Sequence, residues 1–124
     1  MVLVEKKITL TQFYQVIFEG QQIGVAPGVW RTVVESHTFL KDFAANKVIY
    51  GVNTGFGPMA QYRIRDEDTN QLQFNLIRSH AAGTGELLPA MLVKAAMLTR
   101  LSNLSRGKSG VHNCKNLLIE ISRQ

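Results

Sequence analysis

The sequence predicts a mainly α-helical chain with short strands near residues 8–10, 22–25 and 48–50. Apolar residues recur at helical spacings of three and four through several segments, and glycine or proline separates these segments. Hydrophobic residues make up 45% and charged residues 19% of the 124 residues, which is typical of an ordinary globular chain. This length suits a single domain over residues 1–124.

The first helix is predicted over about residues 11–19. Thr9 and Gln12 have the spacing of a capping box, in which each residue satisfies a free backbone N–H of the first turn. Gly20 then supplies a typical stop signal. Two of the expected short extended segments flank this helix.

A longer helix is predicted from Gly28 to about Asn46. Its apolar stripe includes one histidine, His37, which we interpret as a hydrogen-bonded core residue rather than a ligand. The stripe consists of Trp30, Val33, Val34, His37, Leu40 and Ala44.

Three further helical segments follow. The carboxylates of Asp66, Glu67 and Asp68 favour a helix start, because negative charge stabilises the amino end of the helix dipole. Gly83 is the expected end of that helix. A helix from Pro89 to about Ser105 is apolar around much of its circumference, so it needs neighbours on several sides. A last helix from about Asn113 carries Leu117, Leu118 and Ile121, which have no obvious partner in the sequence.

Composition excludes several classes of function. The net charge of +5 comes from scattered Lys and Arg residues in runs of two at most, which argues against nucleic-acid binding. The apolar runs are too short for a membrane span, and the first residues lack a signal-peptide layout, so we expect a cytoplasmic protein. The single cysteine, Cys114, is expected to be an inert thiol, and no metal site is predicted.

The most unusual stretch is the loop over residues 48–59, VIYGVNTGFGPM. Three glycines fall within seven residues, and a proline follows at once, so no regular element continues through it. Glycine allows another group to approach bare backbone N–H groups closely. Tyr50, just before the loop, can give or take a proton. From the residues alone, a tight strand-to-loop turn with a core tyrosine is the favoured interpretation.

The segment YGVNTGFG resembles the signature of the aromatic amino acid lyases and aminomutases, which include the histidine, tyrosine and phenylalanine ammonia-lyases. Residues 72–85 (LQFNLIRSHAAGTG) and 100–111 (RLSNLSRGKSGV) are similar to the next two family segments, in the same order. The resemblance covers essentially the whole chain. It implies the amino-terminal part of the helical ammonia-lyase fold, which is fumarase/aspartase-like.

The resemblance also implies a chemistry: the deamination of L-histidine to urocanate, or of L-tyrosine to coumarate. It identifies Tyr50 as the catalytic acid/base and Gly57 as a backbone N–H donor near the substrate carboxylate. The family electrophile, 4-methylidene-imidazol-5-one, forms from an internal Ala-Ser-Gly that this sequence lacks. We therefore expect the chain alone to be inactive. The family implies a homotetramer, completed by the remainder of the lyase chain and by other subunits.

His80 carries the substrate preference in this interpretation. Leu72, Leu76 and His80 share one helix stripe, so periodicity alone favours an inward, hydrogen-bonded core histidine. The resemblance instead implies that Ser79 and His80 line the pocket for the substrate ring. An imidazole there suits a ring with its own hydrogen-bonding group and disfavours a bare phenyl. Histidine or tyrosine as substrate, a tyrosine aminomutase, and a non-catalytic interaction module all remain open.

Overall fold

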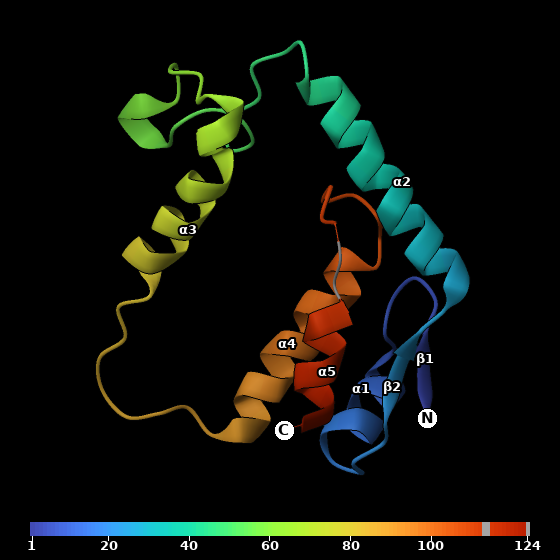
Figure 1. Cartoon of the computed structure of the whole chain (residues 1–124). Coiled ribbons are helices and arrows are strands. Elements are labelled where there is room, and N and C mark those ends of the chain that lie inside the picture. Colours follow the sequence, from blue (N-terminus) through green and yellow to red (C-terminus); the bar gives the residue numbers. More distant parts are fainter. Residues whose placement is uncertain (113–114, 124) are drawn as a thin grey trace. The chain divides into compact units, whose positions relative to one another are not determined.

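The computed structural model describes residues 1–112 and 115–123. Cys114, the predicted helix start at Asn113, and Gln124 lie outside the described residues. The chain divides into two compact units (Figure 1): unit 1 is residues 1–40 with 87–124, and unit 2 is residues 41–86. The predicted, mainly helical fold class is confirmed, as the element bounds show. The elements are β1 (Val2–Val4), α1 (Leu10–Ile17), β2 (Ile23–Val25), α2 (Pro27–Ala44), the 3₁₀ turns η1 (Gly57–Met59) and η2 (Asp66–Asp68), α3 (Thr69–His80), α4 (Ala90–Leu104) and α5 (Lys115–Arg123).

A two-stranded parallel sheet joins β1 to β2, with Val2 opposite Ile23 and Val4 opposite Val25. The valines of β1 face the core and Leu3 between them is exposed, which is the alternation expected of a half-buried strand. Of the predicted strands, the one over residues 22–25 is confirmed. β1 was not predicted, because three apolar residues are too few to show an alternation.

The predicted strands over residues 8–10 and 48–50 are wrong. Leu10 is instead the first residue of α1, because Thr9 caps the helix one position earlier than expected. The capping box itself is confirmed: the backbone N–H of Thr9 donates to Gln12 Oε1 at 3.0 Å, and the backbone N–H of Gln12 donates to Thr9 Oγ1 at 3.2 Å. Residues 48–50 lead directly into a turn, which the side chain of Asn53 holds.

The hydrophobic core of unit 1 gathers residues from both ends of the sequence. Leu98 and Leu101 of α4 are fully buried, α4 packs against α1 and α5, and α5 also contacts β2 (Figure 1). The predicted need of this helix for several neighbours is therefore met. The last helix also has a partner, since Ile121 is buried. The core residues are Val2, Val4, Val16, Ile23, Val25, Val29, Val33, Leu98, Leu101, Leu104 and Ile121.

The turn after α4 packs closely against α2, and glycine makes this possible. A Cβ at Gly107 would lie 2.4 Å from Thr32 Cγ2, and one at Gly110 would lie 2.3 Å from Leu40 Cδ2. His37 is half-buried, and its Nδ1 lies 2.9 Å from the carbonyl oxygen of Gly110. The interpretation of His37 as a hydrogen-bonded structural histidine is therefore confirmed.

Candidate active site

All four predicted site residues lie in unit 2. Tyr50 and Gly57 belong to the loop that precedes η2, whereas Ser79 and His80 are the last two residues of α3. The loop and the helix end each have their own network of hydrogen bonds.

Asn53 holds the first half of the loop. Its side chain is 6% exposed, and all of its hydrogen bonds go to backbone groups. Oδ1 accepts from the N–H of Ile49 at 2.8 Å, while Nδ2 donates to the carbonyl oxygens of Lys47 at 2.7 Å and Ala44 at 3.2 Å. A single buried amide thus satisfies three backbone groups of the segment that leads into the turn, and its own polar atoms are all paired, as buried polar groups require.

Thr54 closes the second half. Its fully buried hydroxyl accepts from the N–H of Gly51 at 3.3 Å and donates to the carbonyl of Gly55 at 2.9 Å. Thr54 also forms an antiparallel bridge with Arg63, next to a 3.1 Å hydrogen bond from Gly55 N to Tyr62 O. Backbone pairing between residues 54–55 and 62–63 therefore holds the two sides of the loop together.

The loop glycines serve different purposes. A Cβ at Gly55 would lie 2.6 Å from Met59 Cβ and 2.7 Å from Met59 O, so only glycine fits there. Gly51 and Gly57 have φ values of +74° and +55°, which L side chains rarely adopt. No atom lies within 4 Å of a Cβ built on Gly57, so the space beside its backbone is open to an incoming group.

Tyr50 projects from this fixed loop into solvent. Its side chain is 64% exposed, and its ring meets Phe56 edge-on, with centroids 6.1 Å apart and an interplanar angle of 74°. Among the described residues, the structure gives the Tyr50 hydroxyl no hydrogen-bond partner. The phenol is thus held by its ring and left free at its oxygen.

Ser79 and His80 are brought together at the carboxyl end of α3. Ser79 Oγ donates to the carbonyl oxygen of Leu76 at 2.8 Å, and His80 Nδ1 lies 2.9 Å from the same oxygen. Ser79 Oγ and His80 Nδ1 are 3.1 Å apart. The three polar groups therefore form one compact cluster.

The prediction that His80 faces inward is wrong for this chain, because its side chain is exposed. None of the α3 residues is buried, and Phe74 and Ile77 are 57% and 65% exposed. Periodicity identifies residues that share a stripe but not what covers the stripe. α3 also ends at His80 rather than at Gly83.

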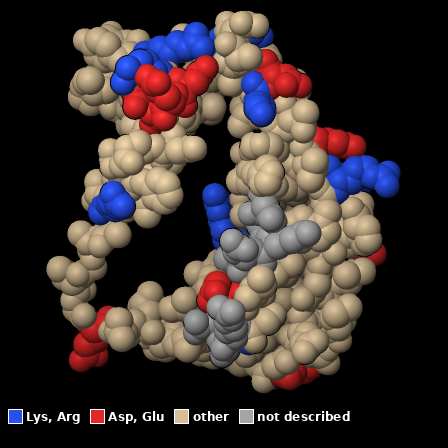
Figure 2. Space-filling model, viewed as in Figure 1, with Lys and Arg blue, Asp and Glu red and all other residues tan. Residues whose placement is uncertain are grey.

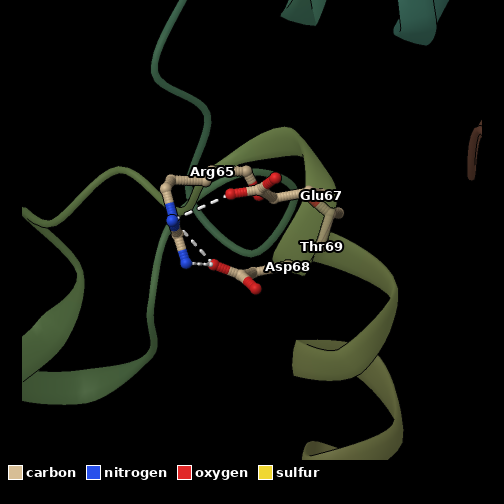
Figure 3. Close-up of polar contacts among 4 residues, drawn as sticks. All are labelled: Arg65, Glu67, Asp68 and Thr69. Atoms are coloured by element: carbon tan, nitrogen blue, oxygen red, sulfur yellow. Dashed lines mark hydrogen bonds and ion pairs between the residues drawn. The ribbon is translucent and has the colours of Figure 1, made fainter.

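Arg65 anchors the start of α3, a role that the sequence analysis missed (Figure 3). Its guanidinium pairs with Glu67 Oε1 at 2.8 Å and with Asp68 Oδ2 at 2.7 Å. The three predicted carboxylates do stand at the amino end of the helix, in η2, but Asp68 makes no side-chain capping bond. A cation directly before an acidic triplet is the signal that could have revealed this pairing.

Neither of two surface hollows among the described residues is lined by Tyr50, Gly57, Ser79 or His80. One, of about 940 Å³, lies in unit 1, and the other, of about 380 Å³, lies between residues 63–65 and α3. Basic side chains on the face shown in Figure 2 occur in separate small groups.

In the described ranges, no three His, Cys, Asp or Glu residues cluster as metal ligands, and no helix has the length and apolarity to cross a bilayer.

A family model described as aromatic amino acid lyase matches residues 8–118, which include the loop and both residues at the end of α3. The chain belongs to the aromatic amino acid lyase family. Two histidine ammonia-lyases of this family are similar in sequence. That of Clostridium tetani is 40% identical over 98% of this chain and 24% of its own length. That of Legionella pneumophila is 39% identical over 85% of this chain and 21% of its own length.

Solved structures of the aromatic amino acid lyase family share the fold. Phenylalanine aminomutase from Pantoea agglomerans matches with a TM-score of 0.91 and 29% identity over 99% of this chain and 25% of its own. Tyrosine aminomutase from Streptomyces globisporus matches with a TM-score of 0.79 and 29% identity over 98% of this chain and 23% of its own. The chain thus spans about a quarter of the length of these relatives.

Proposed function

We propose that this chain is the amino-terminal portion of an aromatic amino acid ammonia-lyase that deaminates L-histidine or L-tyrosine. The observation that carries the proposal is the geometry at Tyr50: a phenol with an unbonded hydroxyl, on a loop fixed by the buried side chains of Asn53 and Thr54. A general base must be presented to its substrate in a fixed place with its proton-accepting atom free, and this arrangement supports that role.

Four residues have parts in this proposal. Tyr50 removes the proton from Cβ of the amino acid. The backbone N–H of Gly57 binds the substrate carboxylate, which the open space beside Gly57 supports. His80, with Ser79, faces the substrate ring and favours rings that carry a hydrogen-bonding group.

The residues present do not fit the family's prosthetic group, 4-methylidene-imidazol-5-one. This group forms from Ala-Ser-Gly, and the sequence has none. The nearest string, Lys108-Ser109-Gly110, belongs to the turn in which the Gly110 carbonyl lies against His37. The electrophile therefore has to come from outside these residues, and we propose that the 124-residue chain alone is inactive.

The proposed partners are the remainder of a lyase chain and the other subunits of a cytoplasmic homotetramer. Unit 2 supports this with large apolar side chains that are more than half exposed. They are Val48, Tyr50, Met59, Tyr62, Phe74 and Ile77. Surfaces of this kind on a soluble chain are typical of interfaces.

A chimera tests the proposal. The matching amino-terminal quarter of the Clostridium tetani histidine ammonia-lyase is replaced by this chain, and the purified protein is incubated with L-histidine, L-tyrosine and L-phenylalanine. Formation of urocanate or coumarate, followed by absorbance, supports the proposal. A folded tetrameric chimera without any turnover refutes it and favours a non-catalytic interaction module.

The same assay distinguishes the ammonia-lyase from a second candidate function, a tyrosine aminomutase. The structural similarity to the Streptomyces globisporus enzyme favours this second candidate. An aminomutase returns ammonia to the neighbouring carbon and yields β-tyrosine. Chromatography of the reaction with L-tyrosine distinguishes β-tyrosine from coumarate.

A further inference from the structure

We infer that the carbonyl of Leu76 and the hydroxyl of Ser79 hold His80 as the Nδ1–H tautomer, so that Nε2 is presented as a hydrogen-bond acceptor. Ser79 is then a positioning residue that acts through His80. The consequence of this tautomer for substrate choice rests on the proposed function: the site accepts rings with an N–H or O–H donor and rejects rings that carry only acceptors.

The tautomer follows from the two partners of Nδ1. A carbonyl oxygen can only accept, so the 2.9 Å contact between His80 Nδ1 and Leu76 O requires a proton on Nδ1. The hydroxyl of Ser79 donates its own proton to the same carbonyl oxygen at 2.8 Å. Its lone pairs are then free to accept from Nδ1–H at 3.1 Å.

The opposite assignment conflicts with this geometry. If Nδ1 were unprotonated, its lone pair would face the carbonyl oxygen of Leu76 at 2.9 Å, and two acceptors would repel each other. A neutral imidazole carries its proton on one nitrogen and accepts on the other, and the hydrogen bond of one nitrogen decides the role of the second. Nε2 is therefore the acceptor.

Nε2 in this state discriminates by the direction of the hydrogen bond. A phenol O–H or an imidazole N–H on the substrate ring donates to it. A bare phenyl leaves it unpaired, and a ring substituent that only accepts brings a second lone pair against it. An acceptor that the bound ring covers and leaves without a donor typically weakens binding by about tenfold.

The tautomer is measured on the chain itself, by long-range ¹H–¹⁵N correlation spectra of protein labelled with ¹⁵N-histidine at neutral or mildly basic pH. The chain has three histidines, and the spectrum of His80→Gln identifies the signal of His80. We expect Nδ1 protonated and Nε2 unprotonated. The Nε2–H form, which free histidine prefers, overturns the inference.

Two matched variants test the part of Ser79. Ser79→Ala should lower the ratio of Nδ1–H to Nε2–H tautomer about two- to tenfold, because one of the two acceptors of Nδ1–H is lost. Ser79→Thr keeps the hydroxyl and should keep the ratio of the parent. An unchanged ratio in Ser79→Ala shows that Ser79 has no positioning role.

A kinetic test uses the chimera with two substrates. The ring substituent of 4-aminophenylalanine can donate a hydrogen bond, whereas that of 4-fluorophenylalanine cannot. The ratio of their kcat/KM values should fall about two- to tenfold in Ser79→Ala and recover in Ser79→Thr. The intrinsic reactivities of the two substrates cancel in this comparison. A ratio that does not change overturns the inferred selectivity. A chimera inactive on every substrate refutes the proposed function but leaves the tautomer measurement standing.

Discussion

The side-chain oxygen of Asn53 accepts a 2.8 Å hydrogen bond from the backbone N–H of Ile49, the residue directly before Tyr50. The same side chain donates to Lys47 and Ala44, and its backbone carbonyl accepts from Ile64 N at 2.9 Å. The buried side-chain amide of Asn53 therefore holds the approach to Tyr50, while the backbone carbonyl of the same residue pairs with the far side of the loop. The position of the phenol depends on a residue that need not touch substrate.

Replacing Asn53 with alanine should loosen the loop while unit 1 stays folded. The change leaves the part-buried N–H of Ile49 and carbonyl of Lys47 without their side-chain partner, which costs about 1–2 kcal/mol and corresponds to roughly fivefold to thirtyfold faster local opening. Hydrogen exchange of the Ile49 and Ile64 amides measures this opening. Asn46→Ala, at an exposed position nearby, is the control. Equal exchange rates in the two variants would contradict the role given to Asn53.

Tyr50→Phe in the chimera should lower kcat/KM by about 10²- to 10⁴-fold, because the hydroxyl is the proposed proton carrier. The phenylalanine ring can keep the edge-on contact with Phe56, so the fold should be unaffected. Tyr62→Phe, at a 53% exposed tyrosine of the same unit, is the matched control and should retain activity. If Tyr50→Phe stays within a few-fold of the parent, another group takes the proton.

His80→Phe in the chimera should move the substrate preference toward L-phenylalanine. The substitution removes a polar group that only a polar ring can satisfy, which changes relative kcat/KM by roughly tenfold to a hundredfold. The measurement is the ratio of phenylalanine turnover to histidine or tyrosine turnover. His112→Phe, at an exposed histidine of unit 1, should leave this ratio unchanged. A constant ratio in His80→Phe would assign His80 a structural role only.

The 124-residue chain alone should not turn over any of the three aromatic amino acids. The Cβ proton is too weakly acidic for a lone phenol to remove, and the chain contains no Ala-Ser-Gly. The measurement is the absorbance of urocanate, coumarate and cinnamate during long incubation with purified chain. Sustained turnover, in a preparation free of other lyases, would show that an electrophile forms within these residues.

Leu98→Ala should destabilise unit 1 by about 2–5 kcal/mol, because it leaves a cavity at a fully buried position of α4. Leu92→Ala, on the same helix but 49% exposed, should change stability by less than about 1 kcal/mol. Urea unfolding, followed by helical circular dichroism, compares the two. Similar losses in both variants would place the core elsewhere than on the Leu98 face.

The helices of unit 1 were predictable because their signals are local. Thr9 and Gln12 specify a cap by spacing alone, and Gly20 ends the first helix with a φ of +65°. The extra strand β1 was not predictable, because Val2 and Val4 become a strand only by pairing with Ile23 and Val25, some twenty residues away. Strand pairing depends on the partner more than on local preference.

The features of the candidate site also fall into those that local sequence signals predict and those that depend on contacts distant in sequence. The YGVNTGFG segment indicated an irregular loop, and the structure shows one. The alternative of a core tyrosine is wrong, since Tyr50 is 64% exposed. The exposure of His80 was not predictable, since the spacing of Leu72, Leu76 and His80 says nothing about what covers the stripe. Arg65 was missed because an ion pair with Glu67 and Asp68 leaves no periodic signal.

The core of unit 1 has a consequence for the order of folding during synthesis. Val2 and Val4 share their core with Ile121, so the hydrophobic centre is incomplete until residue 121 has left the ribosome. Unit 2, residues 41–86, is continuous in sequence, and the hydrogen bonds of the Asn53 and Thr54 side chains join residues within it. Long-range contacts slow folding, and chains fold as their parts emerge. The loop of Tyr50 should therefore take shape on the nascent chain before the core of unit 1 closes.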